Sequence, residues 1–208
     1  MTQEQLDWTG DKNSVFKTLG SSAHSQYERE ERDYYATDPI AISNLLEIEQ
    51  FDNDIWECAC GGGHMVNRLR EHGHNVFATD IVYRGGGHKR LDFLSYDALN
   101  YLYKYDIITN PPYRYALEFV NRATLIAKDK VAMFLRLQFL ETQRRYKFFK
   151  QCPPSRVLVF SSRIQCAKNG EFEKYKDGSA QAYAWFIWEK GFSGNPVIKW
   201  IPPNNKVR

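Results

Sequence analysis

The 208-residue chain has few cysteines and no long hydrophobic run. Its longest apolar runs, such as residues 182–188, are far shorter than the roughly 20 residues that cross a bilayer. No apolar segment of the signal-peptide kind follows the polar residues 2–5. We therefore expect a reduced, intracellular, cytoplasmic protein without membrane partners, in which no disulfide framework joins the four cysteines, Cys58, Cys60, Cys152 and Cys166.

The chain also lacks a large net charge, an internal repeat and a low-complexity segment. The formal net charge of +3 says little by itself about nucleic acid. The cations are unevenly placed, however, because residues 114–156 contain ten Lys and Arg but only three Asp and Glu. Such a local excess is typical either of a solvated helix face or of a surface for an acidic partner.

The periodicity predicts one α/β domain over residues 34–208, preceded by a polar arm over residues 1–33. A polar insert at 163–181 separates the last two predicted strands, which should pair as a hairpin and place one reversed strand in a mostly parallel sheet. The predicted helices cover residues 37–49, 64–73 and 115–127, and the predicted strands cover residues 54–59, 75–80, 105–109, 130–137, 156–162 and 182–190.

A glycine-rich turn, "ECACGGG" at 57–63, follows a predicted strand and opens a predicted helix. Glycines let a ligand approach the backbone closely, and a helix N-terminus favours a negative group. Asp80 ends the next strand, nineteen residues after Gly61, where a carboxylate commonly accepts hydrogen bonds from ribose hydroxyls. Together these residues indicate a nucleoside-type cofactor.

The spacing favours S-adenosylmethionine over a dinucleotide. Val66 stands where the dinucleotide fingerprint requires a third glycine or an alanine, which disfavours an oxidoreductase. S-adenosylmethionine has a ribose and an adenine but no pyrophosphate, so it suits the turn and Asp80. Asp92 could accept from the adenine amino group and Phe93 could pack on the ring, although Asp92 taken by itself is better suited to a turn or a helix N-cap.

The stretch "NPPY" at 110–113 follows an apolar strand. Two prolines fix the backbone and remove two N–H donors, and Pro111 pushes Asn110 towards an extended conformation. The result is a stiff arm that carries an amide, free carbonyls and an aromatic ring. The alternative interpretation is a rigid strand-to-helix turn with the asparagine as a cap.

These segments resemble the motifs of the S-adenosylmethionine-dependent amino-methyltransferases, in the γ-type order of N6-adenine DNA methyltransferases. The resemblance is greatest to small single-domain members in phages and bacterial genomes, and it rests on "YYATDP" (34–39), "ECACGGG", Asp80, "LDF" (91–93) and "NPPY".

The resemblance implies a Rossmann-like class I methyltransferase fold, with a seven-stranded sheet, one reversed strand and helices on both faces. It also implies that Tyr35, Thr37 and Pro39 hold the methionine end of the cofactor. The complete set that it assigns to cofactor binding is Tyr35, Thr37, Pro39, Glu57, Cys58, Ala59, Gly61, Gly63, Asp80, Ile81, Asp92, Phe93 and Asn110.

The chemistry of methyl transfer to adenine N6 suits the NPPY arm. The exocyclic nitrogen is a poor nucleophile, and two acceptors on its N–H groups would stabilise the positive charge that develops during attack. The Asn110 side-chain oxygen and the Pro111 carbonyl are such acceptors, and Tyr113 could stack on the flipped base. The Pro111–Pro112 pair keeps these catalytic groups rigid.

The substrate is less well defined than the chemistry. We expect the substrate to be adenine in DNA. The alternatives are adenine in RNA, glutamine in a protein, and a non-catalytic module that binds nucleic acid. The substrate is open because the chain has no room for a separate target-recognition domain. Basic residues near aromatics, Arg144, Arg145 and Arg163, are candidates for substrate contact. No metal is expected, because the spacing of Cys58, Cys60 and His64 does not match that of zinc ligands.

Overall fold

The computed structural model describes residues 34–168, 170–175 and 181–203, and the arm predicted over residues 1–33 lies outside them. The described residues belong to one compact unit. None of the helices within these residues is long and apolar enough to span a membrane.

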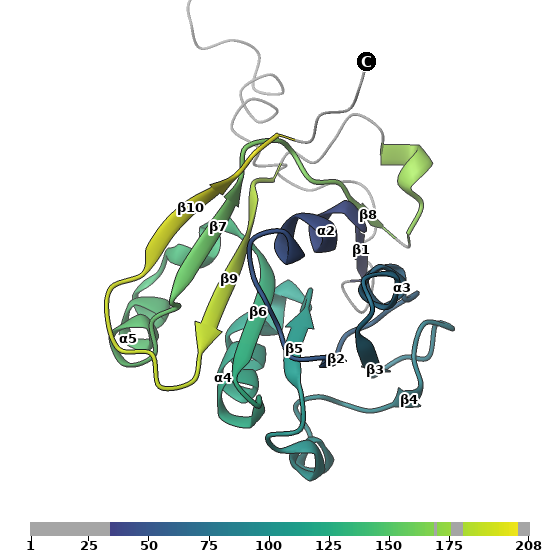
Figure 1. The fold of residues 1–208 in the computed structure, drawn as a ribbon, viewed down its shortest axis with the longest axis horizontal. Helices are drawn as coiled ribbons and strands as arrows, with labels where there is room; N and C mark the ends of the chain where they lie inside the picture. Colours follow the sequence, from purple (N-terminus) through teal and green to yellow (C-terminus); the bar gives the residue numbers. More distant parts are fainter. Residues whose placement is uncertain (1–33, 169, 176–180, 204–208) are drawn as a thin grey trace, which may run out of the picture. The chain divides into compact units, whose positions relative to one another are not determined.

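An eight-stranded sheet forms the centre of the unit (Figure 1), in the order β10-β7-β9-β6-β5-β2-β3-β4. Only β9 runs antiparallel, to both of its neighbours β6 and β7, so the predicted reversed strand and its hairpin-type pairing with β7 are confirmed. The strands are β2 (Asp54–Glu57), β3 (Asn75–Asp80), β4 (Lys89–Arg90), β5 (Asp106–Thr109), β6 (Lys130–Arg136), β7 (Arg156–Phe160), β9 (Tyr183–Glu189) and β10 (Val197–Ile201).

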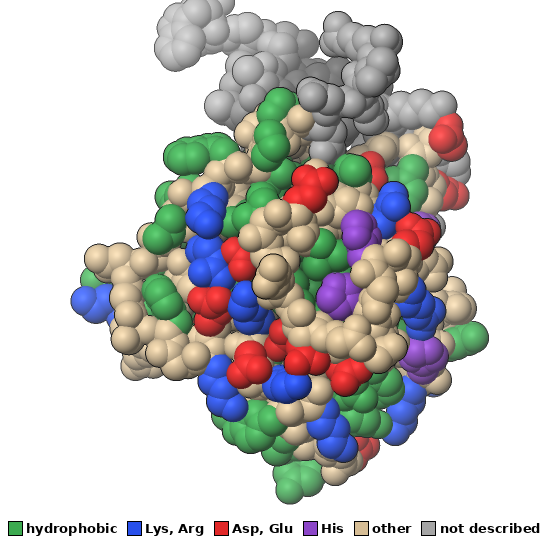
Figure 2. Space-filling model, in the orientation of Figure 1, with side chains coloured by type: hydrophobic (Ala, Val, Ile, Leu, Met, Phe, Trp, Pro, Cys, Tyr) green, Lys and Arg blue, Asp and Glu red, His purple; other side chains and the backbone are tan. Residues whose placement is uncertain are grey.

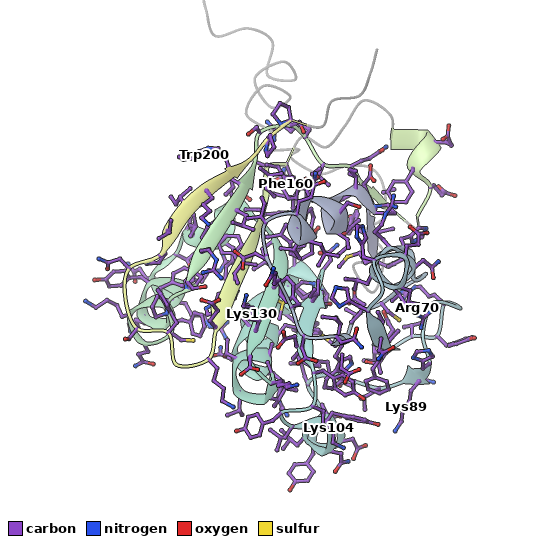
Figure 3. The ribbon with its side chains drawn as sticks, viewed as in Figure 1. Arg70, Lys89, Lys104, Lys130, Phe160 and Trp200 are labelled. Carbon is purple, nitrogen blue, oxygen red and sulfur yellow. The ribbon has the colours of Figure 1, made fainter. Side chains whose placement is uncertain are left out.

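The strand count is eight rather than seven, because β10 adds an edge strand parallel to β7. Four of the five β10 residues are exposed, and Trp200 is 68% exposed (Figure 3). Four of the five β10 residues are nevertheless apolar, namely Val197, Ile198, Trp200 and Ile201, so the sequence carries a strand signal here that the prediction did not use.

A second, two-stranded sheet joins the start of the described chain to the segment that follows β7. β1 (Tyr35–Thr37) pairs antiparallel with β8 (Cys166–Lys168), with Thr37 opposite Cys166. The helix predicted over 37–49 is accordingly shorter, because α2 covers only Ile40–Leu46. Pro39 precedes this helix, and the Asp38 carboxylate accepts from the Ile40 N–H at 3.0 Å. Such a long-range strand pair is not visible in local periodicity.

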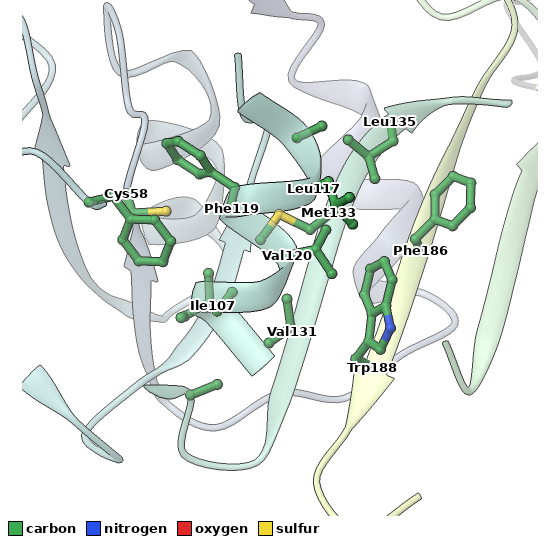
Figure 4. Close-up of a cluster of buried hydrophobic side chains, with 14 of the residues drawn as sticks. Cys58, Ile107, Leu117, Phe119, Val120, Val131, Met133, Leu135, Phe186 and Trp188 are labelled. Carbon is green, nitrogen blue, oxygen red and sulfur yellow. The ribbon is translucent and has the colours of Figure 1, made fainter. Parts of the chain in front are cut away.

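Helices cover both faces of the large sheet, as expected. The pleat sends Ile55 and Trp56, which are neighbours on β2, to opposite faces, and the two belong to different apolar clusters. The cluster of Trp56 includes the buried face of α4 (Figure 4), whereas the cluster of Ile55 includes buried residues of α2 and α3. The remaining helices are α3 (His64–Glu71), α4 (Ala116–Ile126) and α5 (Gln143–Gln151), with 3₁₀ turns η1 (Tyr96–Tyr101), η2 (Tyr113–Tyr115), η3 (Leu137–Leu140) and η4 (Phe172–Tyr175).

Ion pairs connect the strands at the amino-terminal edge of the parallel sheet. The Arg156 guanidinium lies 2.8 Å from a Glu49 oxygen and 2.6 Å from a Glu189 oxygen, and Lys130 lies 3.5 Å from both carboxylates. Figure 2 shows acidic and basic side chains interspersed on this face, and Figure 3 labels Lys130. Lys130 and Arg156, two of the ten cations of the positive run at 114–156, are therefore paired with carboxylates here.

Replacing Arg156 by leucine should destabilise the fold. Glu49 is only 5% exposed, and removing one partner of a buried ion pair costs about 3 kcal/mol. The Arg68→Leu variant is a control, because its partner Glu71 is exposed and an exposed pair contributes at most about 1 kcal/mol. Urea unfolding measures both, and equal losses in the two variants would contradict the assigned role of Arg156.

Candidate active site

The candidate site lies at the carboxyl-terminal edge of the parallel strands. The glycine turn follows β2, Asp80 ends β3, and Asn110 follows β5. These three strands are neighbours in the sheet, and crevices at the carboxyl ends of such strands are the usual ligand sites of α/β folds. The sequence-predicted groups therefore meet at one edge, although Gly61 and Asn110 are 49 positions apart in the chain.

The glycine turn and Asp80 are in direct contact. The Gly61 N–H donates to Asp80 Oδ2 at 2.8 Å, and the Val82 N–H donates to Asp80 Oδ1 at 2.8 Å. Gly61 and Gly63 have φ values of +51° and +83°, which other residues rarely adopt. α3 begins directly after Gly63. The turn and the carboxylate thus form one rigid unit.

A second glycine triplet, at 85–87, packs on the first. A Cβ atom added to Gly86 would lie 2.2 Å from the Gly63 nitrogen and 2.4 Å from the Gly62 carbonyl carbon. A Cβ atom on Gly87 would lie 2.9 Å from Cys60 Sγ. Sequence reasoning did not use this triplet, although three adjacent glycines after Asp80 are a signal of close backbone approach.

Tyr34 and Arg84 cover the turn, and neither was predicted as a site residue. The Gly62 N–H donates to the Tyr34 hydroxyl at 2.9 Å, and the Tyr34 ring packs directly on Gly61. The Arg84 guanidinium lies 4.6 Å from the centre of that ring and 3.4 Å from Asp80 Oδ1. A ligand that bound against this face of Gly61 would have to replace the Tyr34 ring.

Glu57 is the buried carboxyl group beneath the turn. It is 1% exposed at the end of β2, and its Oε1 accepts from the Thr109 hydroxyl and from the Ala59 N–H at 3.1 Å. Burial raises the pKa of Glu57 to about 8, and the nearby Asp80 charge acts in the same direction. The side chain is therefore mainly neutral at pH 7.

Asn110 is held by β1 in a single orientation. Its Nδ2 donates to the Tyr35 carbonyl at 3.1 Å and to Thr37 Oγ1 at 2.8 Å. Because a carbonyl oxygen only accepts, the nitrogen of the amide must face Tyr35. The Asn110 Oδ1 atom is then left buried, with no hydrogen-bond partner among the described residues. Such an atom is costly in a folded protein and calls for an explanation.

Tyr113 lies among aromatic and polar groups from four strands. Its ring stacks on Tyr35 with centroids 6.2 Å apart, and the Arg136 guanidinium lies 4.4 Å from its centre. Its hydroxyl donates to the Tyr183 hydroxyl at 3.3 Å and approaches Cys166 Sγ at 4.0 Å. Burial raises the pKa of Tyr113 well above its ordinary value, so the phenol remains protonated. Arg136 and Tyr183 were not predicted, because only the pairing of β9 with β6 and β7 brings them here.

Three residues predicted to bind the cofactor, Asp92, Phe93 and Cys58, make structural contacts within the fold. Asp92 is exposed, and its Oδ1 accepts from the Leu94 N–H at 2.9 Å, so it forms the turn that was the alternative interpretation. The Phe93 side chain is 1% exposed and packs in the core against Trp56. Cys58 is also a core residue.

Ile81, by contrast, is 47% exposed next to Asp80, which suits an apolar ligand surface. Among the described residues no group of three His, Cys, Asp or Glu side chains could hold a metal ion.

The predicted basic residues belong to the outer surface. The Arg144 guanidinium pairs with Glu118 at 2.8 Å, and Arg145 donates to the Gln138 carbonyl at 2.8 Å. On the other side of α5, Phe148 and Phe149 pack against the apolar cluster of α4, so α5 is amphipathic. Arg163 is exposed just after β7.

No family model and no curated protein matches the sequence. Solved structures do match. The M protein of the type I restriction enzyme EcoKI aligns with a TM-score of 0.53 and 12% identity, over 88% of this chain and 47% of its own. The predicted O-methyltransferase Atu636 of Agrobacterium tumefaciens aligns with a TM-score of 0.52 and 11% identity, over 80% and 86% of the two chains.

The magnesium protoporphyrin IX methyltransferase of Synechocystis PCC 6803, solved with bound S-adenosylmethionine, aligns with a TM-score of 0.50, 12% identity and coverage of 74% and 77%. The fold is that of the Rossmann-like methyltransferases. In this methyltransferase fold the crevice at the carboxyl ends of β2, β3 and β5 is the general ligand site, which is where the glycine turn, Asp80 and Asn110 lie.

Replacing Glu57 by glutamine should remove part of the pH dependence of stability. The folded-state pKa of about 8 exceeds the ordinary 4.5, so the contribution of Glu57 is complete below the ordinary pKa and is lost as the pH rises through the folded pKa. Its share of the free energy of unfolding should fall by up to about 1.4 kcal/mol per pH unit between these limits. Urea unfolding at several pH values measures this slope, and an unchanged slope in the variant would exclude the assigned pKa.

The Gly86→Ala substitution should destabilise the glycine turn. The added methyl group meets backbone atoms of Gly62 and Gly63 rather than a movable side chain, and overpacking of this kind costs about 1–3 kcal/mol. Thermal unfolding compares the variant with the wild type, and a Gly86→Ala variant as stable as the wild type would contradict the contact.

Proposed function

We propose that the protein transfers a methyl group from S-adenosylmethionine to the exocyclic N6 amino group of adenine in DNA. The observation that carries this proposal is the Asn110 side chain. Its Nδ2 is anchored to β1, and its buried Oδ1 has no donor among the described residues. An acceptor that is rigid, buried and unpaired suits a substrate NH₂ group.

The residues around the turn fit S-adenosylmethionine. Gly61 and Gly63 give a backbone without side chains beside Asp80, whose oxygens have lone pairs left for ribose hydroxyls. The Ile81 side chain is available to an apolar ring, and Tyr35 and Thr37 border the site through Asn110. When bound, the cofactor would supply a methyl group on a sulfonium, which is a strong leaving group.

The NPPY arm would polarise the target nitrogen. Asn110 Oδ1 and the Pro111 carbonyl would accept its two N–H groups, which turns the nitrogen lone pair towards the methyl group and stabilises the positive charge that develops as the N–C bond forms and the S–C bond breaks. One N–H proton then leaves to solvent. No strong general base is required, because the amino group loses its proton only after it has become cationic.

Tyr113 would provide an aromatic face for the flipped base. Its position is well defined, because Tyr35, Arg136 and Tyr183 contact it from three other strands. Stacking on such a face offsets the stacking lost when a base leaves the duplex. In this structure the Arg136 guanidinium lies over the ring, so base stacking on that side requires Arg136 to move.

The choice of DNA adenine rests on the order of the motifs and on the likeness to the EcoKI M protein. Radiolabelled methyl transfer to unmethylated DNA, RNA and whole-cell protein extract tests it directly. We expect label in DNA, recovered as N6-methyladenine after digestion. Label only in RNA or only in protein would replace the proposed substrate by the corresponding alternative.

Two substitutions should separate chemistry from cofactor binding. Asn110→Ala should lower kcat by about 10²- to 10³-fold, as the loss of a preorganised hydrogen-bonding group typically does, while the cofactor Kd from calorimetry stays within about threefold. Asp80→Asn should instead weaken the cofactor by about tenfold or more, because the amide repels the N–H and ribose donors that the carboxylate accepts. Loss of cofactor binding in Asn110→Ala would show that Asn110 holds the cofactor, as the resemblance also implies, and would contradict its proposed role at the target nitrogen.

A further inference from the structure

The carboxyl-terminal edge carries an exposed cation–aromatic pair next to Tyr113. Arg114 and Tyr115 belong to the turn η2, and the Tyr115 N–H donates to the Pro112 carbonyl at 2.9 Å. Tyr113, in the same turn, is turned inward against Tyr35 and Tyr183. Arg114 and Tyr115 are exposed, with the guanidinium 4.9 Å from the centre of the Tyr115 ring.

Arg114 differs in its partners from four of the other nine cations of the positive run. Lys128, Lys130 and Arg156 are paired with carboxylates at the amino-terminal edge. At the other edge, Arg144 pairs with Glu118. Arg114 has no carboxylate within salt-bridge distance among the described residues, and its recorded contact is the Tyr115 ring. Its charge is therefore available to an anionic partner.

We propose that Arg114 and Tyr115 bind the DNA strand beside the flipped target nucleotide. This inference rests on the proposed function. A flipped base remains attached to a strand whose next phosphates and bases lie close to the pocket entrance. Residues one and two positions after Tyr113 lie within about 7 Å of it along the chain. A guanidinium for the phosphate and an aromatic face for a neighbouring base is the combination that binds single strands.

The rigidity of η2 supports the proposal. The turn follows two prolines and continues directly into α4, so Arg114 and Tyr115 hold a fixed position relative to Asn110. A contact made from such a support costs little conformational entropy on binding. The contact of Arg114 and Tyr115 with the strand would also position the amino group of the target base next to Asn110 Oδ1.

A second exposed cation–aromatic pair, formed by Lys190 and Tyr103, serves as a matched control for Arg114 and Tyr115. The Lys190 ammonium lies 4.0 Å from the centre of the Tyr103 ring, and Tyr103 is 52% exposed, compared with 43% for Tyr115. Lys190 follows β9 and Tyr103 precedes β5, so this pair lies at the amino-terminal edge, away from the proposed site. Surface cation–π pairs are common in proteins, so only a difference between the two pairs supports the inference.

The test measures binding of the full-length protein to an adenine-containing DNA duplex by fluorescence anisotropy over a range of salt concentrations, together with the KM for that DNA in methyl transfer. Arg114→Ala should weaken binding about 3- to 10-fold and lower the slope of log K against log salt by about 0.9, the loss of one phosphate contact. Arg114→Lys should restore the slope.

Tyr115→Ala should raise the KM for DNA about 5- to 100-fold, as the loss of one stacked base does, whereas Tyr115→Phe should keep it near the wild-type value. The cofactor Kd should not change, and Lys190→Ala and Tyr103→Ala should stay within twofold of wild type in every measurement. Thermal unfolding confirms that each variant is folded.

Two outcomes overturn the proposal, and they are distinguishable. If the wild type methylates DNA but the Arg114 and Tyr115 variants behave like the control pair, the strand contact is wrong and the proposed function stands. If the wild type neither binds nor methylates DNA, both proposals fail together.

Discussion

Two hydrogen bonds from one side-chain amide organise the candidate site. The Asn110 Nδ2 atom donates to the backbone of Tyr35 and to the hydroxyl of Thr37, which joins the arm after β5 to the small sheet of β1 and β8. The same bonds determine which end of the amide is free. The buried Oδ1 atom is therefore a consequence of strand pairing far from residue 110 in the sequence, and the proposed chemistry depends on it.

Close backbone packing shapes the part of the site that we propose binds the cofactor. Gly86 lies against Gly62 and Gly63 so tightly that neither segment tolerates a Cβ atom there, and Asp80 accepts from the Gly61 N–H. The turn, the end of β3 and the loop after it thus act as one unit. Tyr34 and Arg84 cover this unit, so entry of a ligand is coupled to the position of one tyrosine ring.

Electrostatics separates the two edges of the sheet. Cations at the amino-terminal edge are paired with carboxylates such as Glu49 and Asp52, and they stabilise the fold. Arg114 and Arg136, at the other edge, lie against the aromatic rings of Tyr115 and Tyr113. A single positive run in the sequence therefore contains two groups with different physical roles, and only their partners reveal which is which.

The sequence by itself determined the α/β class, the reversed strand and the meeting of the glycine turn, Asp80 and Asn110 at one edge. These features follow from local periodicity and from the geometry of parallel strands, in which carboxyl ends share an edge. Only the tertiary structure decided the pairing of β1 with β8, the burial of Phe93 and the positions of Tyr34, Arg136 and Tyr183 at the site. Each of these depends on contacts between residues far apart in the chain, which leave no periodic signal in the sequence near them.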